Sequence, residues 1–180
     1  RYEGTITPTA TSRHQPGGYY PITVEATNDT GIVSTASGTS LSWLRLRVLE
    51  AMPPVLTLVS PSEGYITTSS PAILLTAKDE AGGSGVDPGS VAAALDGVPV
   101  ACTVTAAAGG YQVSLQPQGL SEGPHRLTVT VSDYDGNQAE LTAAYIVDTV
   151  PPELELDGQD AHVVVDDASV TISGRVRDLT

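Results

Sequence analysis

The stretch LSEGPHRLTVTVSDYDGNQAELTAAYIVDTVPP, residues 120–152, decides the fold class. Apolar and hydroxyl side chains alternate over LTVTVS at 127–132, which is the period of a strand that buries one face. DYDGN at 133–137 favours a tight turn, because glycine and asparagine tolerate positive φ and aspartate bonds to its own backbone. The chain then returns through residues 141–147 to a proline pair. These residues predict a β-hairpin followed by a stiff linker.

Internal similarity divides the 180 residues into modules. Three pairs of segments match, the first two at spacings of 98 and 99 residues: PPVLTL at 53–58 with PPELEL at 151–156, ILLTAKD at 73–79 with ISGRVRD at 172–178, and GYYPITVEATNDTG at 18–31 with GPHRLTVTVSDYDG at 123–136. A repeat of this size is one immunoglobulin-like (Ig-like) sandwich. We therefore expect a partial or small Ig-like module at 1–52, a complete sandwich at 53–149 and the N-terminal part of a further repeat at 150–180.

Within residues 53–149 the pattern predicts seven strands and no helix. DEAGGSGVDPGS at 79–90 predicts a long glycine-rich loop. The Asp-Gly pair at 96–97 predicts a type I′ turn that joins strands at 91–95 and 98–104 into a hairpin. The predicted fold class is all-β, in the form of tandem Ig-like β-sandwiches.

Composition restricts the partners. The formal net charge of −13, with Lys78 as the single lysine, argues against nucleic acid, because phosphate binding needs clustered basic residues. The lone Cys102 has no intrachain disulfide partner, so we expect it to act as a small apolar residue. No run approaches the ~18 apolar residues of a membrane span, so we expect no membrane insertion. Because the chain begins with Arg1 rather than methionine, we expect a part of a longer protein.

The histidines do not support an enzyme. His14, His125 and His162 fall in three different predicted modules, so no Ser-His-Asp triad is expected within one core. His125 stands at the corner where many sandwiches carry a tyrosine, which favours a packing role over proton transfer. The glycines of 82–85 lack the Lys-Ser/Thr of a phosphate-binding loop. We therefore expect no catalytic activity.

Acidic residues form the one constellation with possible chemistry. In an Ig-type sandwich the loop after the second strand and the loop between the last two strands lie at the same end as the N-terminus. Converging carboxylate oxygens at such a joint suit Ca²⁺. The alternative is that these residues are turn formers and solvated charges, with no cofactor. The residues expected to crowd this joint are Asp79, Glu80, Asp133, Asp135 and the linker residue Glu50.

A second candidate site is aromatic. Phenylalanine is absent, so some of the seven tyrosines and the single tryptophan must fill cores. Tyr134, at the tip of its turn, is expected to be the most exposed ring. An exposed aromatic ring can stack on a sugar, although one ring is not a platform.

Several short motifs resemble those of tandem bacterial Ig-like domains, which are related in architecture to fibronectin type III and cadherin repeats. The resemblance runs from about residue 53 to 180 and rests on SGVD at 84–87, LDG at 95–97, LSEG at 120–123, LTV at 127–129, Asp133 with Gly136-Asn137, and DTVPP at 148–152. Upstream, GGYYPITVEATNDTG at 17–31 followed by LRLRVLE at 44–50 is similar to Ig-like modules of tail-associated proteins of phages of Gram-positive gut bacteria.

Both resemblances imply an extracellular, cell-surface or virion protein whose Ig-like units act as spacers, adhesive elements or attachment points. The implied partners are neighbouring Ig-like repeats and a cell-surface protein or glycan. The alternative function is a carbohydrate-binding accessory module of a secreted glycan-active enzyme.

The two ends predict a further contact. Residues 150–180 supply only front strands of a module, and residues 1–49 supply back strands. An open strand edge recruits a partner, so a head-to-tail contact between neighbouring chains would complete one composite sandwich. The alternatives are that the missing strands belong to the parent protein, or that the first 50 residues close into a small domain unaided.

Overall fold

The computed structural model of the chain describes residues 5, 7, 20, 22–37, 46–157 and 172–178. The described regular elements are all strands, which confirms the predicted all-β class. Within these ranges no helix is long and apolar enough to cross a membrane. The strands that the sequence predicts over 41–49 and 170–176 lie partly, and the one over 162–165 lies wholly, outside the described residues.

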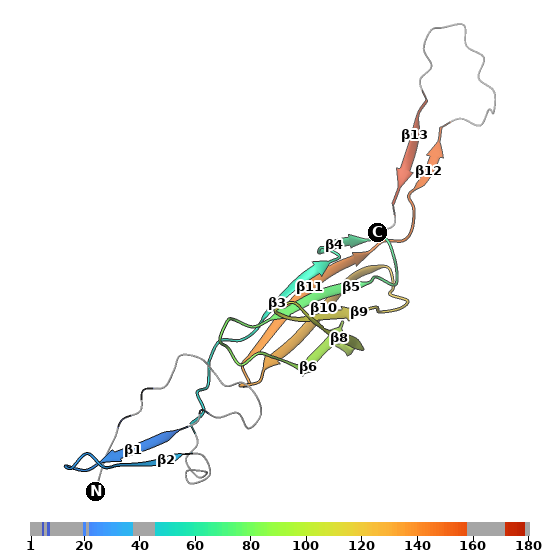
Figure 1. The fold of residues 1–180 in the computed structure, drawn as a ribbon. Helices are drawn as coiled ribbons and strands as arrows, with labels where there is room; N and C mark the ends of the chain where they lie inside the picture. Colours follow the sequence, from blue (N-terminus) through green and yellow to red (C-terminus); the bar gives the residue numbers. More distant parts are fainter. Residues whose placement is uncertain are drawn as a thin grey trace.

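The centre of the chain is a sandwich of two sheets (Figure 1). One sheet has the strand order β4-β11-β10-β6-β7, and the other has the order β3-β5-β9-β8. This is the arrangement of an Ig-like β-sandwich. The strands of the chain are β1 (Thr23–Thr27), β2 (Val33–Ser37), β3 (Val55–Ser60), β4 (Gly64–Ile66), β5 (Ile73–Lys78), β6 (Val86–Leu95), β7 (Val98–Pro99), β8 (Cys102–Ala107), β9 (Gly110–Leu115), β10 (Gly123–Asp133), β11 (Gln138–Val147), β12 (Glu153–Leu156) and β13 (Gly174–Arg177).

The hydrophobic core lies between the inward faces of these two sheets. Every second side chain is buried along β5, and the same alternation holds over 113–115 in β9, 127–133 in β10 and 143–147 in β11. Burying one large aliphatic side chain contributes roughly 1.5–3 kcal/mol, so this set accounts for most of the stabilisation. The largest buried side chains are Tyr145, Ile73, Leu75, Leu127, Val113, Val129, Val131 and Val147.

The glycine-rich loop is shorter than predicted, because β6 already begins at Val86. The first residues of β6 pair with the end of β10, and the register of this pairing shifts between Thr130 and Ser132. Pro88 falls in this irregular part of the strand, where a missing backbone N–H removes no ladder hydrogen bond. The prediction of a loop over 79–90 was therefore wrong for residues 86–90.

The turn at Asp96 and Gly97 has the predicted type I′ character, since both residues have positive φ, 52° and 79°. The hairpin after it is shorter than expected. Of the strand predicted at 98–104, only β7 pairs with β6. The chain then crosses to the other sheet as β8. Residues 53–149 consequently form nine strands rather than the predicted seven, with short β4 and β7 as the additional ones.

The two hairpins outside the sandwich repeat the pairing of strands within it. β1 pairs with β2 at Thr23↔Ser37. When the offset between 18–31 and 123–136 is extended to the following strand, the corresponding pair in β10 and β11 is Thr128↔Thr142. The turns match as well. Asn28 Oδ1 accepts from the backbone N–H of the residue four positions later at 2.8 Å, and Asp133 Oδ1 does the same at 2.8 Å.

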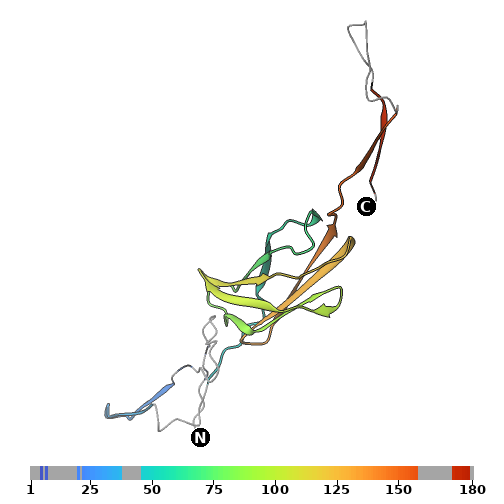
Figure 2. The ribbon, with the colours of Figure 1, turned by 90° about the vertical axis from the view of Figure 1, so that its right-hand side faces the viewer.

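The C-terminal hairpin matches the first strands of the sandwich in the same way. β12 pairs with β13 at Glu153↔Arg177, and their counterparts in the repeat pair as Val55↔Lys78 in β3 and β5. Figures 1 and 2 place the hairpin β1–β2 and the hairpin β12–β13 at opposite ends of the sandwich. The repeats found in sequence therefore coincide with equal strand registers.

Apolar side chains of the C-terminal hairpin lie in solvent. Leu154 is 63% exposed and Val176 is 67% exposed, whereas Ala77, the counterpart of Val176 in the sandwich, is 0% exposed. Together the two outer hairpins supply counterparts of β3, β5, β10 and β11 only. The head-to-tail composite sandwich therefore stays a prediction, and it would lack counterparts of β6 and β9 within the described residues.

His125 forms a polar corner between β10 and the turn before β7. Its Nδ1 lies 2.6 Å from Asp96 Oδ2, and its Nε2 lies 2.9 Å from the backbone oxygen of Ser121. Because both nitrogens face acceptors, this geometry favours the doubly protonated imidazolium. The hydrogen bond to Asp96 and then that to Ser121 raise the pKa of His125. The N–H of Arg126 first, and His125 second, lower the pKa of Asp96.

This corner predicts a pH-dependent stability. Because the pKa of His125 is raised on folding, the protonated ring stabilises the folded state. This stabilisation is fully present below pH 6.5, the pKa in the unfolded chain, and is lost as the pH rises through the folded pKa. The lowered pKa of Asp96 gives stabilisation that is present above 3.8 and is lost as pH falls through the folded pKa. We expect the difference in unfolding free energy between the native chain and His125→Gln to be largest between these two values. Urea unfolding across a pH series measures it, and equal pH profiles would contradict the assignment.

Candidate functional site at the first joint

The linker before the sandwich meets two of its loops at one end. Residues 46–50 run to this end of the sandwich, as Figure 1 shows. The loop 79–85 and the turn 134–137 lie there too, joined by the hydrogen bond from Tyr134 N to the backbone oxygen of Gly85 at 3.0 Å. The predicted crowding of acidic residues at this joint can therefore be examined residue by residue.

Glu50 is held by hydrogen bonds at three of its atoms. Its backbone N–H donates to Asp135 Oδ2 at 3.1 Å, and its backbone oxygen accepts from Asn137 Nδ2 at 3.2 Å. Its side-chain Oε1 accepts from the backbone N–H of Ser84. Because one residue contacts both loops, the linker has a fixed direction where it enters the sandwich.

Asp135 forms an ion pair with Arg47 instead of facing the other acidic residues. The Asp135 side chain is 0% exposed and that of Arg47 is 30% exposed. Arg47 also donates to the backbone oxygen of Tyr134 at 3.4 Å, and the N–H of Asp135 donates to Ser84 Oγ at 3.1 Å. The ion pair thus compensates the charge of a buried carboxylate.

Asp133 is used within its own turn. Its Oδ1 accepts from the backbone N–H of Asn137 at 2.8 Å, and its Oδ2 accepts from Asn137 Nδ2 at 2.7 Å. Its side chain is buried. The structure thus places Asp133 as a turn former, in line with the alternative considered from sequence. The carboxylate oxygens of Asp133 and Asp135 are not part of the group that the other three acidic residues form.

Glu50, Asp79 and Glu80 do come together. One carboxylate oxygen of each lies within 4.8 Å of the others. Glu50 Oε2 and Asp79 Oδ1 are buried without a hydrogen-bond partner within the described residues, whereas Asp79 Oδ2 accepts from Gly85 N at 2.5 Å. A Cβ on Gly83 would lie 2.7 Å from Asp79 Oδ2 and 2.9 Å from Glu50 Oε2, so the loop needs glycine there.

The side chains of Glu50 and Glu80 affect each other's pKa. The neighbouring Glu50 side chain, followed by burial, raises the pKa of Glu80 to about 7. Burial is the largest influence on Glu50 and raises its pKa, but the neighbouring Glu80 side chain and the hydrogen bonds from Ser84 outweigh it, so the pKa is lowered. Of the two, Glu80 therefore takes up a proton more readily. Glu50, Asp79 and Glu80 are the residues that could hold a cation. Arg47, the nearby basic residue, forms its ion pair with Asp135 instead.

Tyr134 is half-buried rather than the most exposed aromatic residue, so that expectation was wrong. The hydrogen bond from its N–H to Gly85 draws the turn against the loop. The most exposed tyrosine within the described residues is Tyr65 on β4, at 70%. Tyr134 nevertheless lines an open pocket together with Tyr111, and the pKa of its phenol is raised by burial first and then by Tyr111 and Asp87.

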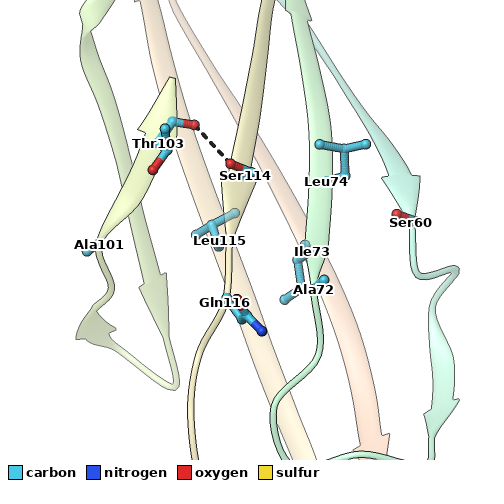
Figure 3. A pocket seen from close by; sticks show the side chains of 9 residues that line it. All are labelled: Ser60, Ala72, Ile73, Leu74, Ala101, Thr103, Ser114, Leu115 and Gln116. Carbon is cyan, nitrogen blue, oxygen red and sulfur yellow. Dashed lines mark hydrogen bonds between the residues drawn. The ribbon is translucent and has the colours of Figure 1, made fainter. Parts of the chain in front are cut away.

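A separate hollow of about 510 Å³ lies on the four-stranded sheet (Figure 3). Ser114 Oγ donates there to the backbone oxygen of Thr103 at 3.4 Å. The lining has no titratable side chain, so this hollow offers no group for acid or base chemistry. The residues that line it are Ser60, Ala72, Ile73, Leu74, Ala101, Thr103, Ser114, Leu115 and Gln116.

The His125 corner has the residue types of a Ser-His-Asp set within one sandwich, which the sequence did not suggest. Ser121 Oγ lies 3.5 Å from His125 Nε2, and Asp96 holds the other nitrogen. The backbone oxygen of Ser121 lies closer to Nε2, at 2.9 Å, and can only accept a hydrogen bond from the Nε2–H. His125 is therefore placed as a donor to the backbone and not as a base for the hydroxyl.

Sequence reasoning missed three residues of the joint: Arg47, Ser84 and Asn137. Arg47 carried a signal, because it alternates with leucine and valine in LRLRVLE and so faces away from the apolar side chains. Ser84 carried none, since a buried serine in a glycine-rich loop has the same sequence as an exposed one. Asn137 was recognised as a turn former, and its second bond, to Glu50, depends on the linker position.

Several solved structures match parts of the chain, and they include the following three. CopC from Methylosinus trichosporium OB3b matches with a TM-score of 0.39 and 19% identity over 52% of this chain and 94% of that one. Dimeric latent PorU from Porphyromonas gingivalis matches at 0.48 and 16%, over 73% of this chain and 14% of that one. The fibronectin(III)-like modules of CbhA from Clostridium thermocellum match at 0.40 and 17%, over 68% and 62%. No protein-family model and no curated protein matches the chain.

Proposed function

We propose that the chain is a non-catalytic, extracellular segment of tandem Ig-like modules that acts as a semi-rigid spacer in a bacterial surface or phage tail protein. The observation that carries this proposal is the fixation of Glu50 by Asp135, Asn137 and Ser84. A linker held at three atoms transmits the orientation of one module to the next. The proline pair at 53–54 restricts the linker further.

The equal strand registers support the tandem arrangement. The hairpin β1–β2 repeats the pairing of β10 and β11, and the hairpin β12–β13 repeats that of β3 and β5. This agreement supports an arrangement in which the sandwich stands between elements of further modules of its own kind. Its proposed partners are neighbouring repeats and, at the end of the assembly, a protein or glycan of a cell surface.

Replacing Asp135 by alanine tests the spacer role. The change removes the partner of Arg47 and the acceptor of the Glu50 N–H, so we expect the hairpin β1–β2 to move relative to the sandwich. Spin labels on Thr35 and Glu140, introduced in a Cys102→Ser background, report the distance distribution by pulsed electron paramagnetic resonance. We expect a narrow distribution that broadens in Asp135→Ala.

The control is Asp157→Ala, which removes a carboxylate near the opposite hairpin and should leave the distribution unchanged. A distribution that is already broad in the native chain would show that the joint is flexible, and the spacer role would then have to be abandoned.

Calcium at the joint is a further part of this proposal. It is supported by the two buried oxygens without partners, Glu50 Oε2 and Asp79 Oδ1, beside Glu80. We expect Ca²⁺ to raise the melting temperature, since a ligand at 100 times its Kd stabilises by about 2.7 kcal/mol. Glu80→Gln should reduce the rise in melting temperature. Asp87→Asn, which changes a carboxylate outside the group of Glu50, Asp79 and Glu80, should leave that rise unchanged. Identical melting in calcium and in EDTA, with no bound metal by elemental analysis, would refute a calcium site.

A further inference from the structure

A pocket of about 580 Å³ opens between the two sheets at the end of the sandwich that carries the joint. Tyr111 reaches it from β9 in the four-stranded sheet, and Tyr134 reaches it from the turn after β10 in the five-stranded sheet. Asp79 and Glu80 line it from the loop after β5, and the rest of the lining is alanine, valine and glycine. We call it the Tyr111–Tyr134 pocket.

The polar side chains of this pocket are all carboxylates or phenols. Among the described residues, no lysine, arginine, amide, serine or threonine side chain lines it. A ligand that fits must therefore supply hydrogen-bond donors and positive charge, while its apolar part contacts the rings and the small apolar side chains. A neutral sugar needs donors from the protein as well as acceptors, and this lining offers donors only through the two phenols.

The charge around the pocket favours the same ligand. Glu50 lies beside Asp79 and Glu80, and Asp87 is close enough to Tyr134 to act on its phenol. The chain as a whole has a formal net charge of −13, which raises the local concentration of cations. An ammonium group near a tyrosine ring is attracted by the ring's negative face as well as by the carboxylates.

We propose that the Tyr111–Tyr134 pocket binds an alkylammonium group, with its charge at Asp79 and Glu80 and its carbon atoms against the two rings. The group can come from two sources: a lysine side chain of a partner protein, or a choline-type headgroup. The inference goes beyond the spacer role, because it gives the segment an adhesive contact of its own. It does not depend on Glu50 holding the joint rigid, so either proposal can fail alone.

Titration monitored by ¹H–¹⁵N NMR spectra of the full chain tests the proposal. The probes are Nα-acetyl-L-lysine methylamide, choline chloride and methyl β-glucoside, each in EDTA so that calcium does not compete for Asp79 and Glu80. We expect both ammonium probes, and not the glucoside, to shift the amide signals of Gly110, Tyr111 and Tyr134. The stronger of the two ammonium probes identifies the source.

Variants separate the rings from the charge. Tyr134→Ala should weaken binding roughly tenfold, whereas Tyr134→Phe, which keeps a ring, should retain most of the affinity. Tyr65→Ala, at an exposed tyrosine outside the pocket, should leave the affinity unchanged. Glu80→Gln should weaken binding and reduce its dependence on salt. Unchanged melting temperatures confirm that the variants are folded.

Three outcomes would overturn the inference. The first is the absence of shifts at the pocket with either ammonium probe. The second is binding of the glucoside in their place, which would assign the pocket to a sugar. The third is equal affinity of the native chain and Tyr134→Ala, which would show that the cations contact only exposed carboxylates.

Discussion

Replacement of Leu75 by alanine is expected to lower the free energy of unfolding of the central sandwich by about 3 kcal/mol. Leu75 is 0% exposed, and its backbone pairs with Leu58 on one side and Val113 on the other. The substitution leaves a cavity in the middle of the core, with neighbouring strands on both sides that limit how far it can collapse. Urea denaturation followed by tyrosine fluorescence measures the change.

The matched control is Leu74→Ala, one residue earlier on the same strand. Leu74 points to the outer face of the sheet, where Figure 3 shows it at the hollow beside Ser60. Its replacement by alanine should lower the free energy of unfolding by less than about 1 kcal/mol, because truncation at a partly exposed position leaves no closed cavity. If the two substitutions destabilised equally, the assignment of inner and outer faces on β5 would be incorrect.

Gly110→Ala is expected to destabilise the sandwich by about 2–3 kcal/mol through a steric conflict. A Cβ at this position would lie 2.2 Å from the backbone oxygen of Ala77, which is closer than any real contact. The next residue, Tyr111, pairs with Ala77, so the clash would force β9 away from β5. Thermal unfolding measures the loss, and the amide signal of Tyr111 should shift strongly.

Gly109→Ala separates this conflict from backbone strain. Gly109 has a φ of +74°, but a Cβ there would meet no atom within 4 Å. The substitution should therefore lower the free energy of unfolding only by the strain of an alanine in a left-handed backbone conformation, about 1 kcal/mol. A Gly109→Ala variant that is less stable than Gly110→Ala would show that the close approach of β5 does not decide the result.

Much of the fold was predictable because the determining interactions are local or periodic. The alternation at 127–132 places side chains on two faces, and it identified the inward face of β10 without any knowledge of its neighbours. The Asp96-Gly97 pair gave the turn type, because few residues adopt positive φ at two successive positions. The sequence repeat matches β12 and β13 with β3 and β5, and the matched residues pair in the same register.

What local patterns missed depends on contacts between distant segments. The start of β6 at Val86 is set by pairing with the end of β10, and a segment containing proline and glycine looks like a loop until that partner is known. The crossing of β8 to the other sheet has the same origin, since alternation does not reveal which strand lies alongside.

The candidate site was predictable as a location but not as a set of contacts. Topology correctly brought Glu50, Asp79 and Glu80 to one end. The sequence did not show that Asp135 is neutralised by Arg47, because that pair joins residues 88 positions apart. Neither did it show that Tyr111 shares a pocket with Tyr134, since the two belong to different sheets.

The parallel pairing of β4 with β11 has a mechanical consequence. These strands run in the same direction, with Tyr145 opposite Gly64 and Val147 opposite Ile66, and the chain enters and leaves the sandwich at opposite ends (Figure 1). Tension applied between the ends would pull β4 and β11 past each other along their length. The hydrogen bonds between them would then bear the force together, in shear, instead of opening one after another as in an unzipped hairpin.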